Sequence, residues 1–318
     1  VGAYSIFKIK KENKPENKPE NIPVMGVMGA FVFATQMVNF TIPGTGSSGH
    51  LCGGLLLSAL IGPYGGFLSM MAILLLQCLL FADGGLMAYG CNVWNMAFYA
   101  CFFGYFCIYK PILGKNPSKK KILIASILGS VLSLQLGAFS VTLETLISGV
   151  TELPFLTFLS FMQPIHLAIG FVEGLITSAV LIFVYNTRPE MLNLNEKSNE
   201  FSFKKVIAIL SIVTVLIGGG ISLLASSSPD GLEWSMENVA GSTELDSKGS
   251  AYDKASEIQE KTTLLPDYSI SNSNNEILGT SFSGVLGSVL VAVILIGGSL
   301  IFRFYKKGAK NEQIRKSA

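Results

Sequence analysis

The feature that most constrains this chain is a series of long apolar segments separated by short polar loops. Half of its 318 residues are hydrophobic, only 14% are charged, and the mean hydropathy is +0.51. Soluble domains carry a charge at roughly 25% of positions, so this composition indicates a membrane protein. An apolar run of about 20 residues can cross a bilayer as a helix. We predict an all-α, polytopic transmembrane helical bundle with about eight complete crossings, at residues 23–40, 51–61, 67–81, 88–113, 122–146, 155–185, 206–225 and 282–302.

The loop charges predict the orientation of the chain. Counting crossings places all the basic clusters on one side, at residues 8–18, 115–121, 188–205 and 303–316. The positive-inside rule makes that side the cytosol, so we expect a multi-pass protein in the cytoplasmic (inner) membrane of a prokaryote. The outer loop at 226–277 carries three bases against ten acids. It either concentrates cations at the outer face or is only a solvated acidic linker.

These loops divide the chain into five predicted parts. We expect residues 1–22 to be the end of a truncated first helix plus a cytosolic linker, because Val1 stands where a gene product has Met. The others are a membrane domain at 23–185, a second cytosolic linker at 186–205, a two-helix module with the acidic outer loop at 206–302, and a basic cytosolic tail at 303–318.

Composition and motifs exclude several classes of function. A net charge of +2 is too small to favour nucleic acid as a partner. The five cysteines show no CxxC pairing and are expected to be small buried hydrophobes. The sequence contains neither HExxH, GxSxG nor GxxxxGK[ST], so we predict that it is not an enzyme and that any ATP is bound by another subunit.

The candidate metal ligand is His50, in the stretch TIPGTGSSGHLCGG between the first two apolar segments. Neutral imidazole is the commonest side-chain ligand for borderline divalent metals, and Ser48 lies beside it. The alternative is an interfacial His that only forms hydrogen bonds. Asn39, a polar residue near the outer end of the preceding helix, is a further candidate.

Polar residues inside the apolar segments are candidates for a second shell or a pathway. His166 and Glu173 are seven apart and share a helix face with Gln163, either as a lower station for a cation or as a packing clamp between helices. Asn92 and Asn95 lie three apart, where their amides either orient a ligating His or cap the helix.

Several motifs resemble a known family. AFVFATQMVNFTIPGTGSSGHLCGG, IGPYGG, LLFADGGLMAYGCNVWNMAF and QPIHLAIGFVEGLIT are similar to the NikM/CbiM substrate-binding component of energy-coupling-factor transporters for nickel and cobalt, over about residues 23–185. SPDGLEWSMENVAG resembles the companion NikN/CbiN module, whose PDGLE motif falls on Pro229, Asp230, Gly231, Leu232 and Glu233. The chain therefore resembles a fused, NikMN-type protein with a metal-binding domain at 23–185.

The resemblance implies a metal site and a mechanism. It implies that His50 binds the metal together with an N-terminal Met-His that is absent here, and that nickel is favoured over cobalt as the transported substrate, with no covalently bound cofactor. It implies capture outside the membrane, docking in the lipid bilayer on a NikQ/CbiQ-like coupling protein, and inward release driven by NikO/CbiO-like ATPases. Asp230 and Glu233 are candidate contacts to the metal-site loop, or only cap and solvate a helix end.

The sequence leaves two other classes of function open. One is an energy-coupling component for an organic micronutrient, although the outer loops offer few aromatic residues for such a pocket. The other is a membrane metal sensor or scaffold, which would be expected to carry a cytosolic signalling domain; the cytosolic loops are short.

Overall fold

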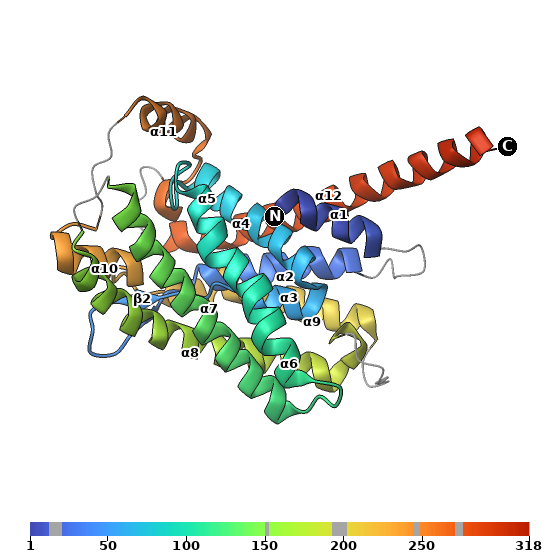
Figure 1. Ribbon diagram of the computed structural model, residues 1–318, viewed down its shortest axis with the longest axis horizontal. Helices are drawn as coiled ribbons and strands as arrows, with labels where there is room; N and C mark the ends of the chain where they lie inside the picture. The colour runs from blue at the N-terminus through green and yellow to red at the C-terminus, as the bar shows by residue number, and fades with distance from the viewer. Residues whose placement is uncertain (13–20, 150–152, 193–201, 244–248, 271–275, 318) are drawn as a thin grey trace.

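The structure, a computed structural model, describes residues 1–12, 21–149, 153–192, 202–243, 249–270 and 276–317. In this part the chain is almost entirely helical, which confirms the predicted all-α membrane fold (Figure 1). Its elements are α1 (Gly2–Glu12), α2 (Asn21–Gln36), β1 (Phe40–Thr41), β2 (Ser48–Gly49), α3 (Gly54–Ile61), α4 (Pro63–Phe81), α5 (Tyr89–Asn92), the π-helix η1 (Val93–Tyr109), α6 (Lys110–Leu113), α7 (Lys119–Ser148), α8 (Phe155–Thr187), η2 (Pro189–Leu192), α9 (Phe203–Gly219), η3 (Ile221–Leu224), α10 (Gly231–Ala240), α11 (Ser250–Thr262), η4 (Pro266–Tyr268) and α12 (Glu276–Ser317).

Six helical segments in the described ranges are long and apolar enough to span a membrane. They are Pro63–Phe81, Tyr89–Leu113, Lys119–Ser148, Phe155–Thr187, Phe203–Leu224 and Leu278–Ile301. The prediction of about eight crossings was therefore too high. The predicted helix at 51–61 is only the eight-residue α3, about 12 Å long against a hydrocarbon core of about 30 Å, and α2 is also short, at 16 residues.

The chain between α2 and α3 accounts for one of the two missing crossings. The predicted helix is short and Gly-rich and starts at Leu51, but Gly53 has a φ of 81° and no helix forms until Gly54. The predicted break after Ile61 shrinks to one residue, Gly62, because Pro63 can start α4 directly. An irregular stretch followed by a short helix thus replaces one predicted crossing.

The two halves of the chain form one bundle. The helix α2 packs against both α9 and α12, which come from the C-terminal half, and α7 packs along α8. Glycines allow the close approach of α2 and α12, since a Cβ on Gly29 would lie 2.3 Å from Leu295 Cδ1. Because α2 leads into the strand pair before His50, helices of the C-terminal half support the candidate site.

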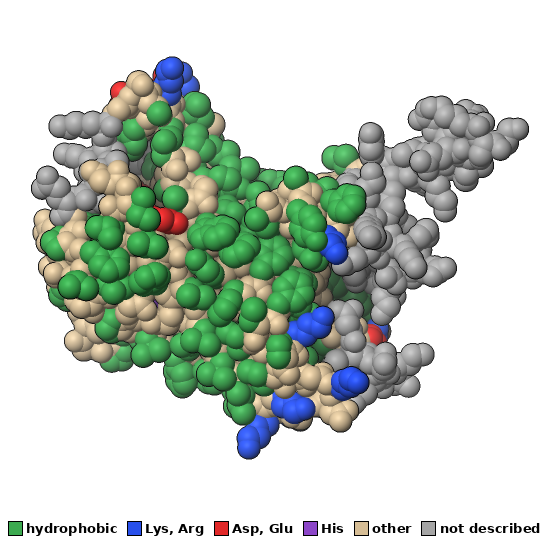
Figure 2. Space-filling model, viewed as in Figure 1, with side chains coloured by type: hydrophobic (Ala, Val, Ile, Leu, Met, Phe, Trp, Pro, Cys, Tyr) green, Lys and Arg blue, Asp and Glu red, His purple; other side chains and the backbone are tan. Residues whose placement is uncertain are grey.

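The face in view is largely apolar, with few charged side chains among the described residues (Figure 2). Apart from those on α11, the Lys and Arg side chains visible in this view lie toward the end that carries α6, away from α10. Cys91 and Cys107 are exposed, so the prediction that every cysteine is buried is wrong for these two. An apolar side chain on a membrane helix can face lipid instead of the protein core.

Some predicted features fall wholly or partly outside the described residues. These are most of the polar linker before residue 21, most of the linker at 186–205, and the side chains of the tail at 303–318. The division of the chain into five parts stays a prediction.

Candidate functional site

A short hairpin holds the candidate site in place. Strands β1 and β2 pair antiparallel, and the turn between them uses Gly44 and Gly46, both with positive φ (79° and 81°), a conformation that favours glycine. Gly49 ends β2 against α8, where a Cβ would lie 2.4 Å from Ile169 Cγ1. The hairpin therefore lies close on α8 and places His50 directly after it.

A buried carboxylate supports the non-helical backbone after His50. Glu173 of α8 has no exposed surface, and its Oε2 and Oε1 accept the N–H groups of Cys52 (2.9 Å) and Gly53 (3.1 Å). Gln36 donates its side-chain amide to the Cys52 carbonyl oxygen (2.9 Å). Irregular backbone at membrane depth is tolerated only where its polar groups are satisfied inside the protein, and these side chains do that.

The two ring nitrogens of His50 have different neighbours: Nδ1 contacts a backbone carbonyl, and Nε2 is directed toward Asp230. Nδ1 lies 3.2 Å from the carbonyl oxygen of Leu51. Because a carbonyl can only accept, Nδ1 carries the hydrogen and Nε2 presents its lone pair in the neutral ring. The side chain is 28% exposed, and Nε2 lies 3.9 Å from Asp230 Oδ2.

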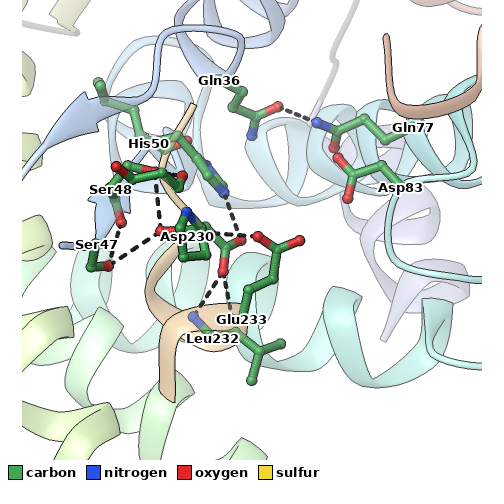
Figure 3. Close-up of polar contacts among 12 residues, drawn as sticks. Gln36, Ser47, Ser48, His50, Gln77, Asp83, Asp230, Leu232 and Glu233 are labelled. Atoms are coloured by element: carbon green, nitrogen blue, oxygen red, sulfur yellow. Dashed lines mark hydrogen bonds and ion pairs between the residues drawn. The ribbon is translucent and has the colours of Figure 1, made fainter. Parts of the chain in front are cut away.

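The PDGLE segment binds the hairpin through its backbone. The Ser48 N–H donates to the Pro229 carbonyl oxygen and its hydroxyl donates to that of Ser228, both at 2.8 Å. The Trp234 indole N–H donates to the Thr45 carbonyl oxygen (3.1 Å). Segments about 180 residues apart in sequence thus form one surface around His50 (Figure 3).

Asp230 caps α10 and also faces His50. Its Oδ1 accepts the N–H groups of Leu232 (2.8 Å) and Glu233 (2.9 Å), and Glu233 Oε2 accepts the Asp230 N–H (3.1 Å). This reciprocal capping box fixes the carboxylate, with Oδ2 directed toward the imidazole (Figure 3). Asp230 therefore caps α10 and faces His50, and Glu233 completes the cap; a contact of either carboxylate with a metal site stays a prediction.

Beside this pair lies a cavity of about 150 Å³ between the hairpin, η1, α7, α8 and α10. The predicted site residues that line it are His50, Asn92, Asn95, His166, Asp230, Gly231 and Leu232. Both histidines of the chain therefore face one cavity. Asn39, Ser48, Glu173, Pro229 and Glu233 are not among the lining residues; the Asn39 carbonyl oxygen accepts the N–H of Ser226 (2.8 Å).

The polar residues Gln163, His166 and Glu173, predicted to share one face of α8, make different contacts. Gln163 and Gln135 of α7 exchange hydrogen bonds between side-chain amides and backbone carbonyls (3.2 and 2.9 Å), as the packing alternative expects. His166 Nδ1 lies 2.7 Å from the Met162 carbonyl oxygen, one turn earlier in the same helix. A role for His166 as a cation station stays a prediction.

The two asparagines hold loops and helices together. Neither caps the helix, which begins at Tyr89. Asn95 donates to Glu144 Oε2 (2.9 Å), and Asn92 donates to the Gly84 carbonyl oxygen (3.4 Å).

Sequence reasoning missed a second contact between the two halves. The Tyr268 hydroxyl donates to Asp83 Oδ2, and its ring stacks on Phe81 with the centroids 4.8 Å apart. Desolvation by neighbouring atoms raises the pKa of the Asp83 carboxyl although the residue reaches the surface, while the Tyr268 hydrogen bond and His50 oppose the rise. The only available signal was an acid in a Gly-containing turn, FADGG, which does not identify a partner 185 residues away.

Within the described residues, no group of three or more His, Cys, Asp or Glu side chains is arranged to hold a metal ion. What the site offers is the nitrogen of His50 facing the oxygen of Asp230.

Comparison with known proteins gives two family matches. Residues 1–191 match CbiM, described as a cobalt uptake substrate-specific transmembrane region, and residues 204–304 match the PDGLE domain. The chain is 32% identical to a fused nickel transport protein, NikMN, of Archaeoglobus fulgidus, over 92% of this chain and 88% of that protein. It is also 32% identical to a fused nickel transport protein, LarMN, of Lactiplantibacillus plantarum, over 75% and 73%.

Among solved structures, a truncated transition metal transporter is 29% identical with a TM-score of 0.48, covering 57% of this chain and 90% of that chain. The CbiM match covers more than half of the residues, and the fused relative aligns across both matched regions. The chain belongs to the CbiM family of nickel and cobalt transport proteins, in the fused NikMN-type form that carries a PDGLE domain.

Proposed function

We propose that this protein captures nickel or cobalt ions for an ATP-driven energy-coupling-factor importer, with His50 as a metal ligand. The observation that carries the proposal is the setting of His50. Its Nε2 presents a lone pair beside a cavity, on a backbone held by Glu173 and by the PDGLE segment. Imidazole nitrogen is a ligand well suited to nickel.

The size of the cavity supports an ion over an organic micronutrient. Pockets for small organic molecules usually measure about 300–1,000 Å³. The cavity at His50 measures about 150 Å³, which is room for an ion with a few waters. An organic ligand would require the hairpin or α10 to move away.

The other parts of the proposal follow from the family and from the loop charges. The hairpin and α10, which carry the site, lie away from the end where most of the visible basic side chains gather (Figures 1 and 2), so the positive-inside rule makes the site face outward. The chain lies in the cytoplasmic membrane of a prokaryote and docks on a transmembrane coupling protein through its Gly- and Ala-rich helix faces, and separate ATPase subunits drive release. Asn92, Asn95 and His166 are then the second-shell or pathway residues.

Nickel accumulation in cells that carry the chain, a coupling protein and the ATPases tests this function. We expect His50→Ala to abolish accumulation and His166→Ala, a matched change on the same cavity, to reduce it less. Equal loss in both variants would contradict the role of His50. Accumulation by wild type that does not depend on active ATPase would contradict the energy-coupling mechanism.

A further inference from the structure

We propose that the core between α3, α7 and α8 is an internal water-binding site, in which bound water molecules bridge the Glu173 carboxylate and the hydroxyls of Ser126, Ser130 and Thr177. These four residues are called the Glu173 cluster below. The inference goes beyond the proposed function and is independent of the captured ion, because none of the four residues lines the cavity at His50.

The first support is that the cluster is polar and fully enclosed at membrane depth. The two serines belong to α7 and the other two residues to α8, and both helices are long and apolar enough to span a membrane. Ser126, Glu173 and Thr177 have no exposed surface, and Ser130 is only 1% exposed. Polar groups at such a depth are costly unless they are hydrogen-bonded.

The second support is that helix packing brings the four residues to one place. The two serines are one turn apart on α7, and Glu173 and Thr177 are one turn apart on α8, so each pair shares a helix face. The two helices pack along each other, and a Cβ on Gly174 would lie 2.4 Å from Ile127 Cα. These contact residues directly follow Glu173 and Ser126. Because the helices run in opposite directions, the residues that precede the contact lie on the same side of the pair. The short helix α3 closes that side, since the two N–H groups that Glu173 accepts directly precede it.

The third support is that the three hydroxyls have no hydrogen-bond partner among the residues that the structure describes. A hydroxyl on a helix can donate to a carbonyl oxygen one turn earlier, as Ser178 does to Leu175 and Thr187 does to Phe183, both at 2.8 Å. The hydroxyls of the Glu173 cluster do not. A buried polar group left this way costs free energy, and ordered water is a common partner for it.

The fourth support is the unused acceptor capacity of the carboxylate. A carboxylate has about four acceptor positions, and the N–H groups of Cys52 and Gly53 use two of them. None of the ion pairs in the described part of the chain includes Glu173. Two free acceptor positions and three hydroxyls match about two water molecules, since a buried water makes about three hydrogen bonds. These waters solvate a buried charge that no cationic side chain offsets.

Apparent melting temperatures of the detergent-purified full chain test the inference through the sign of a change. A dry, unpartnered hydroxyl is unfavourable, so its removal would raise the melting temperature. A hydroxyl bound to water is stabilising, so its removal lowers the melting temperature. The test variants are Ser130→Ala and Thr177→Val, the second of which keeps the side-chain shape. Ser178→Ala is the matched control, because its hydroxyl is bonded within its own helix and because it carries the same gain in helix propensity as Ser130→Ala.

We expect Ser130→Ala to melt about 2–4 °C below the control, and Thr177→Val to melt below wild type by a similar amount. Oxidation by hydroxyl radicals, generated from bound water by a brief X-ray pulse, gives a second readout that a purely structural hydroxyl would not change. Leu55 of α3 is fully buried and lies next to the cluster, since a Cβ on Gly129 would be 2.7 Å from Leu55 Cδ2. We expect oxidation of Leu55 in wild type and its loss in the double variant, while Phe33, equally buried on α2, stays unmodified in both.

A higher melting temperature in both variants, or a Leu55 that is as unmodified as Phe33 in wild type, would overturn the inference, because the cluster would then be dry. A wild-type melting temperature that rises with sodium or potassium at constant ionic strength, and does not do so in Thr177→Val, would also overturn it, because an alkali cation would then fill the site. Each of these results would leave the proposed function standing, since that function depends on His50.

Discussion

The substitution Glu173→Gln tests how the backbone beside His50 is held. In the wild type, the N–H groups of Cys52 and Gly53 each reach a separate oxygen of one carboxylate. Glutamine offers one oxygen and one NH₂ group, so one of the two buried N–H groups loses its acceptor. An unsatisfied buried donor costs about 1–3 kcal/mol, and we expect the free energy of unfolding to fall by that amount. Glu173→Ala leaves both donors unsatisfied and should cost about twice as much.

The free energy of unfolding can be measured by titrating micelles with a denaturing detergent, and hydrogen exchange reports directly on the amides of Cys52 and Gly53. Glu237→Gln is the control, because Glu237 is exposed on α10 and loses the same charge. We expect faster amide exchange at Cys52 and Gly53 in Glu173→Gln but not in the control Glu237→Gln. A stability within about 0.5 kcal/mol of wild type, with amide protection unchanged, would refute this account of the carboxylate.

Three further outcomes are expected. Gly49→Ala should destabilise the protein by about 1–3 kcal/mol in the same unfolding assay, because its Cβ would overlap Ile169, and adding Ile169→Ala should recover part of the loss. Asp83→Asn keeps an acceptor for Tyr268 but cannot ionise. Because desolvation raises the pKa of Asp83 in the folded protein, wild-type stability should fall as the pH rises from the ordinary value of 3.8 through the raised one. Thermal melts at increasing pH should therefore favour the variant progressively, and a pH-independent difference would contradict this. Nickel at about 100 times its Kd should stabilise wild type by about 2.7 kcal/mol in a thermal-shift assay and leave His50→Ala unchanged.

The sequence predicted the regular part of the fold well. The segments at 122–146 and 155–185 are long and continuously apolar, and they appear as α7 and α8 with ends displaced by only a few residues. The failure at 51–61 has a physical cause. Hydropathy registers that a segment is apolar, but it does not register that Glu173 and Gln36 satisfy a non-helical backbone there.

The site was predictable residue by residue but not as an arrangement. The motif around His50 and the PDGLE motif were both visible in the sequence, yet the hydrogen bonds from Ser48 to Ser228 and Pro229 join positions about 180 residues apart. The spacing of seven placed His166 and Glu173 on one helix face. Seven residues also separate them by about 10 Å along the axis, and only His166 reaches the cavity.

The central claim is that His50 holds the transported ion. Metal content measured by plasma mass spectrometry tests it most directly, on the detergent-purified full-length gene product and its His50→Ala variant, each loaded with nickel and cobalt and then desalted. The account predicts stoichiometric nickel in the wild type and none in the variant. Equal nickel in both proteins, or no metal in either, would contradict it.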